Sequence, residues 1–258
     1  MSQVIKNEGK FQFIEAGNAS KEPLLLLHGL MGGLSNFGPA IDHFSKTYYV
    51  VIPTLPIYEM PMLFVSLDGL LAFVEEFVAY KGYERVHLIG NSLGGHLALM
   101  YVLKNPKGSA SLTLTGSSGL YENAMGKTFP KRGDYEFIKK KTQETFFDPA
   151  IATQELIDEL FATVNDRNKA LRIIMTSKSA VRNNLSGRLH EIKCPTLLIW
   201  GRNDCVTPPF VGVKFHELIP QSQLVWVEEC GHVPMMEHPQ RFNDILEVFL
   251  TEIMPVDK

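Results

Sequence analysis

Residues 86–95 read VHLIGNSLGG, and this stretch decides the fold. The apolar run Val86–Ile89 is typical of a buried strand, and an amphipathic helical pattern covers Ser92–Leu103. Between them the sequence fits G-x-S-x-G, with Ser92 in the middle. In a sharp turn from strand to helix, small residues two before and two after the serine relieve crowding and hold its hydroxyl above the sheet. The pattern therefore predicts a nucleophile at Ser92; the alternative is a glycine-rich turn whose serine only caps the helix.

Short apolar runs alternate with longer amphipathic stretches along the rest of the chain. Strands that alternate with helices form βαβ units, and these build a parallel sheet with helices on both faces. The predicted fold class is therefore α/β, with Phe11–Ala16 as a candidate antiparallel edge strand. The predicted buried strands are Leu24–Leu27, Tyr48–Ile52, Val86–Ile89, Leu112–Thr115, Pro195–Trp200 and Gln223–Val227, and the clearest helices are Leu67–Tyr80, Ser92–Leu103 and Phe242–Ile253.

One interval, from about Tyr121 to His190, breaks this alternation because it contains no strand-like run. Most connections between strands and helices have only ~2–6 residues, so this interval needs structure of its own. Asp134 and Asp166 each precede a helical pattern and are expected to cap a helix, and a third helical pattern runs from Thr153 to Val164. We expect a helical insertion over one end of the sheet; the alternative is three helices that extend the core.

Composition and charge exclude several classes of binding partner. The 258 residues carry 25 basic and 28 acidic side chains, a net charge of −3, which argues against a nucleic-acid binder. Three cysteines form no disulfide framework, and no cluster has metal-ligand spacing or a nucleotide-binding glycine pattern. No apolar run reaches the ~18 residues of a membrane span, and no signal peptide is evident. We expect a cytoplasmic protein with a small-molecule substrate, no metal, no cofactor and no nucleic-acid or membrane partner.

A second motif lies earlier in the chain, at residues 25–33, which read LLLHGLMGG. An apolar strand runs directly into a glycine-rich loop, and such a loop can bring a backbone N–H close to a substrate oxygen. Together with the N–H of the residue after the nucleophile, this donor would form an oxyanion hole.

An acid and a base follow two late strands. Asp204 comes just after the apolar run that ends at Trp200, and His232 lies between a strand and the last helix. A serine hydroxyl needs a base at neutral pH, and an imidazole needs a carboxylate to fix its tautomer. Of the eight histidines only His232 has this position, and the stretch 116–120 after an earlier strand offers no carboxylate. The order Ser92, Asp204, His232 is that of α/β-hydrolases.

The chain resembles the α/β-hydrolase superfamily, in particular the single-domain serine hydrolases with a helical lid. The matching segments are LLLLHGLMGG at 24–33, LIGNSLGG at 88–95, LLIWGRNDCVTP at 197–208 and ECGHVPMMEHP at 229–239. The resemblance implies a mostly parallel eight-stranded sheet, a core domain made of residues 1–120 and 191–258, and a lid at 121–190 inserted after strand six.

The same resemblance assigns roles to single residues. It implies Ser92 as nucleophile, Asp204 as acid and His232 as base, with the backbone N–H groups of Leu30 and Leu93 as oxyanion donors. Relatives with a nucleophilic aspartate are disfavoured because position 92 is serine. Many relatives have D-x-x-G-x-G-x-S where residues 53–61 read PTLPIYEMP, so the shape of this loop should differ.

The expected reaction is hydrolysis of an ester-like bond in a small or medium, largely apolar substrate. Two alternatives remain open: a C–C bond hydrolase acting on ring-cleavage products, and a ligand receptor with slow incidental hydrolysis. Cys205 and Cys230 flank the two late motifs, where either thiol sensitivity or ordinary packing is possible. The candidate pocket residues are Met31, Phe37, Leu120 and Val206.

Overall fold

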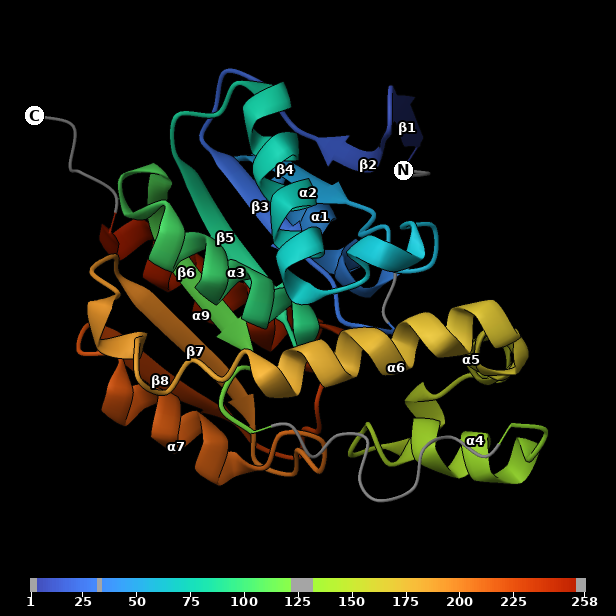
Figure 1. Ribbon diagram of the computed structural model, residues 1–258. Helices are drawn as coiled ribbons and strands as arrows, with labels where there is room; N and C mark the ends of the chain where they lie inside the picture. The colour runs from blue at the N-terminus through green and yellow to red at the C-terminus, as the bar shows by residue number, and fades with distance from the viewer. Residues whose placement is uncertain (1–3, 32–33, 122–131, 254–258) are drawn as a thin grey trace, which may run out of the picture.

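A single sheet forms the centre of the molecule. The computed structural model describes residues 4–31, 34–121 and 132–253, and within these ranges eight strands follow the order β1-β2-β4-β3-β5-β6-β7-β8 (Figure 1). β1 pairs with β2 and β2 with β4 in antiparallel fashion, whereas all later neighbours are parallel. The strands are β1 (Ile5–Glu8), β2 (Phe11–Ala16), β3 (Pro23–Leu27), β4 (Tyr49–Pro53), β5 (Val86–Asn91), β6 (Ser109–Thr115), β7 (Thr196–Gly201) and β8 (Ser222–Val227).

The central strands are buried along nearly their whole length because both faces of the sheet are covered. Leu25 on β3 lies in register with Leu88 on β5, which in turn lies beside Leu112 on β6, and all three are fully buried. The helices α2 (Leu67–Lys81), α3 (Leu93–Lys104) and α7 (Pro209–Leu218) contribute to the core on one face. The core on the other face is built with α1 (Gly38–Phe44), the short α8 (Pro234–Glu237) and α9 (Pro239–Ile253).

The predicted architecture is confirmed, with one correction at the sheet edge. The six predicted buried strands and the three predicted helices are present, with ends that differ by a few residues. β2 is antiparallel as expected, but it is not the edge strand, because β1 pairs along its outer side. β1 reads IKNE and is largely exposed, so it lacks the apolar alternation that predicts a strand.

Three helices lie between β6 and β7 in the chain: α4 (Tyr135–Gln143), α5 (Gln154–Asn165) and α6 (Arg167–Arg182). Asp134 and Asp166 cap α4 and α6 as expected: Asp134 accepts from the N–H of Phe137, and Asp166 accepts from two N–H groups. Thr153 caps α5 by accepting from the N–H of Leu156. In Figure 1 the three helices lie at the end of the sheet toward which the parallel strands point. Residues 122–131 of the expected insertion, and Gly32 and Gly33 of the glycine-rich loop, lie outside the described ranges.

Candidate active site

Ser92 stands on a tight turn between β5 and α3. Its φ of 55° lies in the left-handed region, which a residue with a side chain rarely adopts and which occurs at functional sites. Glycines allow the strand and helix to approach: a Cβ at Gly90 would lie 2.5 Å from Gly95, and one at Gly94 would lie 2.0 Å from the carbonyl oxygen of Leu27. The N–H of Ser92 donates to the Thr115 carbonyl on β6 at 3.1 Å, which fixes the turn to the next strand.

Asp204 and His232 form a buried pair. Nδ1 of His232 lies 2.9 Å from Oδ2 of Asp204, and the two side chains are 7% and 0% exposed. The other carboxylate oxygen accepts from the N–H groups of Val206 and Thr207, both at 2.8 Å, and the Thr207 hydroxyl donates to Oδ2 at 2.8 Å. Because an ionised carboxylate only accepts, Nδ1 carries the proton in this arrangement and Nε2 keeps its lone pair. The imidazole in this arrangement leaves Nε2 able to accept a proton.

The backbone around His232 is fixed from two directions. Its N–H donates to the Thr145 carbonyl at 2.9 Å, and its own carbonyl accepts from Nδ2 of Asn91 at 3.2 Å. Thr145 follows α4, so a residue of the inserted segment contacts the predicted base through the main chain. Asn91 directly precedes Ser92, so the same side chain links the two loops.

Glu237 adds a second link between these segments. One carboxylate oxygen accepts from the N–H of Gly231 at 2.8 Å, and the other accepts from the N–H of Phe147 at 2.7 Å. We call this arrangement the Glu237 bridge. Gly231 allows the close approach, because a Cβ there would lie 2.6 Å from the carbonyl oxygen of Thr145. The bridge joins the loop of His232 to the segment after α4.

Ser92 and His232 line one cavity of about 610 Å³ beneath the inserted helices. The part of the cavity wall that comes from α4, α5, α6 and the segment after α4 is mostly apolar. Within the described ranges no hydrogen bond joins the Ser92 hydroxyl to the imidazole. Such bonds are often loose without substrate and tighten when it binds. The apolar side chains that α4, α5, α6 and the segment after α4 give to the cavity are Phe137, Ile138, Phe146, Leu156, Leu160, Val164, Ile174, Ala180 and Val181.

The two expected oxyanion donors also line this cavity. Leu93 is the first residue of α3, so its N–H has no acceptor within the helix. The carbonyl of Leu30 accepts from the Tyr58 hydroxyl at 3.2 Å, so the unusual loop 53–61 braces the glycine-rich loop. His28 adds a second brace, because its Nε2 accepts from the N–H of Leu55 at 3.0 Å, and burial lowers its pKa. His28 is therefore neutral and positions the loop.

Not every expected pocket residue lies at the cavity. Met31 and Val206 line it, whereas Phe37 and Leu120 are not among its described lining residues. Phe37 is fully buried, in the core with α1 and α9, and Leu120 packs against the core on the other face. Cys205 also lines the cavity, whereas Cys230 is buried, and burial raises the pKa of its thiol.

Thr207, Asn91 and Glu237 were missed as site residues by sequence reasoning. Thr207 and Glu237 fall inside segments quoted for the family resemblance, three and five residues after Asp204 and His232. Their contacts depend on loops from distant parts of the chain. The only sequence signal for these residues is therefore that each lies close in sequence to a predicted site residue.

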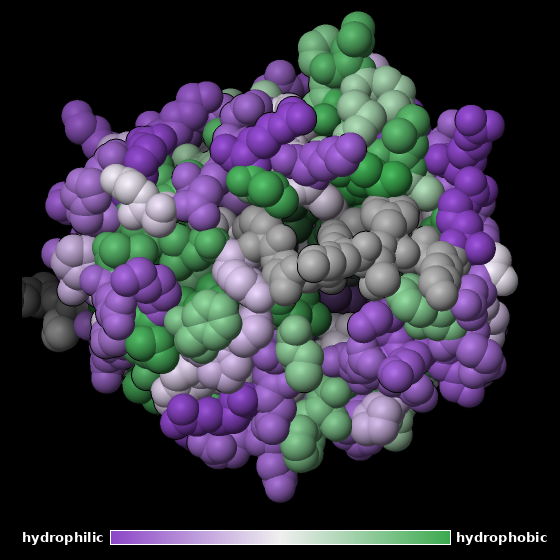
Figure 2. Space-filling model, turned by 60° about the horizontal axis from the view of Figure 1, so that its bottom comes forward, coloured by the Kyte–Doolittle hydropathy of each residue, from purple (hydrophilic) through white to green (hydrophobic). Residues whose placement is uncertain are grey.

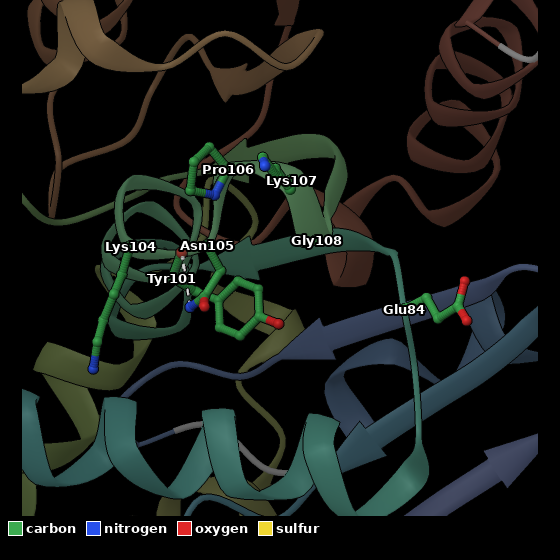
Figure 3. Close-up of a pocket in the computed structure, with 7 residues that line it drawn as sticks. All are labelled: Glu84, Tyr101, Lys104, Asn105, Pro106, Lys107 and Gly108. Carbon is green, nitrogen blue, oxygen red and sulfur yellow. Dashed lines mark hydrogen bonds between the residues drawn. The ribbon is translucent and has the colours of Figure 1, made fainter.

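A second hollow of about 430 Å³ lies elsewhere, around residues 104–108 and Glu84 (Figure 3). These residues precede β5 and β6, so the hollow lies at the amino ends of strands whose carboxyl ends hold Ser92. The dashed line in Figure 3 is the bond from the Asn105 amide to the Tyr101 carbonyl. This hollow has no part in the site of Ser92.

In the described ranges, no group of three or more His, Cys, Asp or Glu side chains is arranged to hold a metal ion. None of the described helices combines the length and the apolar character needed to cross a bilayer.

This sheet, with its serine at the strand–helix turn, is that of an α/β hydrolase. The model of the alpha/beta hydrolase family matches residues 24–245, and the chain belongs to this family. The protein is a hydrolase.

Several relatives match over nearly the whole chain. A 2-hydroxy-6-oxononadienedioate/2-hydroxy-6-oxononatrienedioate hydrolase of Paraburkholderia phymatum is 32% identical, over 90% of this chain and 88% of its own length. Lipase 1 of Psychrobacter immobilis is 28% identical, over 96% of this chain and 83% of its own. The crystal structure of an alpha/beta hydrolase enzyme from the sediment metagenome of the lagoon of Mar Chica, Morocco, is 42% identical, with a TM-score of 0.80, over 96% and 98% of the two chains.

Proposed function

We propose that this hydrolase is a serine esterase with Ser92 as nucleophile, His232 as base and Asp204 as acid. One observation carries the proposal: the buried 2.9 Å contact between Asp204 and His232 adjoins the cavity that Ser92 also lines. A carboxylate that fixes the histidine tautomer, and a serine on a strained turn, are what nucleophilic catalysis by a hydroxyl requires.

In the proposed reaction, Nε2 of His232 takes the proton of the Ser92 hydroxyl while Oγ attacks the ester carbonyl carbon. The N–H groups of Leu30 and Leu93 hold the negative oxygen that forms. The imidazolium then gives its proton to the departing alcohol, which leaves an acyl group on Ser92. Water attacks this acyl group with His232 again as base, and the acid and free serine are released.

The cavity indicates the kind of substrate. The walls supplied by α4, α5 and α6 are mostly apolar, which supports a small or medium, largely apolar acyl group. In this proposal the segment 121–190 acts as the lid of the site, and the rest of the chain is the core domain.

A second candidate is hydrolysis of a C–C bond in a ring-cleavage product. It is favoured by the relative from Paraburkholderia phymatum, whose name gives that activity. A series of p-nitrophenyl esters assayed beside a ring-cleavage dienoate separates the two. A kcat/KM for the dienoate well above that for every ester would favour the C–C reaction.

The test of the catalytic residues is Ser92→Ala, assayed on the preferred substrate and with a fluorophosphonate probe. We expect kcat to fall roughly 10⁴- to 10⁶-fold, with labelling abolished and the fold retained. Ser118 lines the same cavity, so Ser118→Ala is a matched control that should keep the label. Retention of more than about a tenth of kcat in Ser92→Ala would reject the assignment. Labelling of the unaltered enzyme without turnover of any substrate would reject the esterase.

A further inference from the structure

An exposed apolar turn projects beside α6. The turn η2 (Met62–Phe64) follows the unusual loop 53–61, and its Leu63 and Phe64 side chains are 95% and 62% exposed. An exposed Leu–Phe pair at the tip of a turn adds nothing to the core, and contiguous exposed apolar surface in proteins commonly marks a site of interaction. The turn thus exposes two large apolar side chains directly after the loop of unusual sequence.

The neighbouring helix is basic. α6 carries Arg167, Lys169, Arg172, Lys178 and Arg182 and has no acidic residue. None of the five forms an ion pair with another described residue. By contrast, the nearby α4 cations Lys140 and Lys141 both pair with Glu144. In a chain of net charge −3, this helix concentrates positive charge that forms no ion pair among the described residues.

Part of this charge shares one exposed stripe with an apolar residue. Arg167, Leu171, Lys178 and Arg182 follow one another at spacings of four, seven and four residues, which places them on one side of the helix. All four are exposed, with Leu171 at 44%. A helix with a basic stripe and apolar residues beside it is typical of a membrane-surface element.

The turn and the helix are joined directly. Nε of Arg172 donates to the Met60 carbonyl at 3.2 Å, and the N–H of Leu67 donates to the Ser179 hydroxyl at 2.9 Å. We call the surface formed by Leu63, Phe64, Leu171 and the exposed α6 cations the η2–α6 patch. Figure 2 shows the face with the inserted helices, where apolar surface lies directly beside hydrophilic surface.

Acidic groups also lie near the patch, among them Glu159 of α5, which lies close enough to help raise the pKa of Tyr58, the ring that Lys169 covers. Asp166 is occupied as the cap of α6, where it accepts two N–H groups. Glu59 and Asp68, on either side of the turn, are exposed. The stripe itself therefore stays cationic, with the apolar turn beside it.

We propose that the η2–α6 patch docks on an anionic lipid surface, with Leu63 and Phe64 entering the interface and the α6 cations facing the headgroups. Charge complementarity favours this occupant over a second copy of the chain, because a two-fold contact through the patch would set cations against cations. Ile174, Lys178 and Val181 of α6 also line the cavity, so the docked surface adjoins the site of Ser92. This proposal departs from the sequence-based expectation of no membrane partner, and it does not depend on which bond the enzyme cleaves.

The test is sedimentation of the purified full chain with vesicles at low ionic strength. One set contains phosphatidylglycerol and phosphatidylcholine in equal amounts, and the other contains phosphatidylcholine alone. We expect binding to the anionic set to be tighter by roughly tenfold or more and to weaken with added salt. Replacing Leu63 and Phe64 together by Asp should reduce this binding by roughly tenfold or more. Replacing Arg167 and Arg182 by Gln should reduce it by about fivefold for each cation.

The matched control is Val248→Asp on α9, where an equally accessible apolar side chain, 58% exposed, lies outside the patch. This variant should bind the anionic vesicles as the unaltered chain does. The proposal is overturned if the unaltered chain stays in the supernatant with anionic vesicles, or if the Leu63 and Phe64 variant binds them unchanged. It is also overturned if sedimentation velocity shows a dimer that this variant dissociates, since the patch would then be a contact between copies.

Discussion

A single glycine decides how closely β6 can approach the predicted base. Gly116 has a φ of 49°, and a Cβ there would lie 2.7 Å from Nδ1 of His232. Gly116→Ala should therefore displace the imidazole from Asp204. We expect kcat to fall by roughly 100-fold, as displacements of about 1 Å at reacting groups do.

Gly82→Ala is a control that distinguishes the effect of the contact with His232 from the effect of backbone strain. Gly82 also has a left-handed φ, of 69°, but a Cβ there would meet nothing within 4 Å. Both variants should lose stability in thermal unfolding, and only Gly116→Ala should lose kcat at a temperature where both are folded. Equal activity of the two would contradict the role given to Gly116.

A substitution of Thr207 gives a second test of a single residue. Its hydroxyl donates to Oδ2 of Asp204 at 2.8 Å, the same oxygen that faces His232. Thr207→Val removes this donor at nearly constant volume, and a hydrogen bond to a charged group contributes about 1.5–3 kcal/mol. We expect kcat to fall about tenfold or more. Thr207→Ser keeps the hydroxyl and should restore most of the activity; a Ser variant as slow as the Val variant would exclude the hydrogen bond as the cause.

At the scale of elements, the Glu237 bridge connects α8 to the segment after α4. In Glu237→Gln one acceptor becomes an N–H₂ group that faces a backbone N–H, so one of the two hydrogen bonds is lost. Because Gly231 adjoins His232, we expect kcat to fall about tenfold with a smaller change in KM. Steady-state kinetics below the unfolding transition would measure this split.

Glu228→Gln is the matched control for the bridge. Glu228 lies in the same stretch between β8 and α8, but it is 75% exposed and pairs with Arg202 on the surface. This variant should keep both kinetic constants. A Glu237→Gln enzyme with a changed KM and an unchanged kcat would show that the bridge shapes substrate binding and leaves the base in place.

The sequence predicts some elements well because their signals are local. α4, α5 and α6 begin at Asp134, Thr153 and Asp166, whose side chains accept N–H groups of their own helices. β1 and the seven-residue α1 have no comparable signal: β1 is mostly polar and exists through pairing with β2, and α1 has no capping side chain. Elements of this kind depend on contacts with distant residues.

The same distinction holds for the site. Asp204 and His232 follow predicted parallel strands, whose carboxyl ends lie at the same end of the sheet, so the topology predicts that the two residues meet there. Phe37, an apolar candidate for the pocket, instead ends the turn η1 (Leu34–Phe37) and packs into the core. The Glu237 bridge depends on where the inserted segment returns to the sheet, which no local pattern reveals.

At the scale of the whole molecule, Glu15 ties the antiparallel edge of the sheet to α2. It accepts from Lys6 on β1, from Tyr49 on β4 and from Lys81 on α2, the last at 2.7 Å. Burial alone would raise the pKa of Glu15, but these hydrogen bonds lower it to about 2, from a usual 4.5. Because the folded pKa is lower, Glu15 stabilises the fold above about pH 4.5, and this contribution is lost as the pH falls toward 2.

Glu15→Gln should therefore lower the free energy of unfolding at pH 7 by about 1 kcal/mol, since solvent screens part of the interaction. The difference from the unaltered chain should shrink as the pH is lowered from 5 to 3, measured by urea unfolding. Glu76→Gln removes an exposed carboxylate that pairs with Lys10 and should have little effect at any of these pH values. A Glu15→Gln deficit independent of pH would contradict the ionic origin.

Two hydrogen bonds tie the segment after α4 to the region around His232, and they constrain how a substrate can enter. Swinging residues 145–147 outward would break the bonds from His232 to Thr145 and from Phe147 to Glu237, and it would displace the imidazole that we propose as the base. An enzyme that opened on that side would admit the substrate but would lose the arrangement that its reaction needs. We therefore expect a substrate to enter without breaking these two hydrogen bonds.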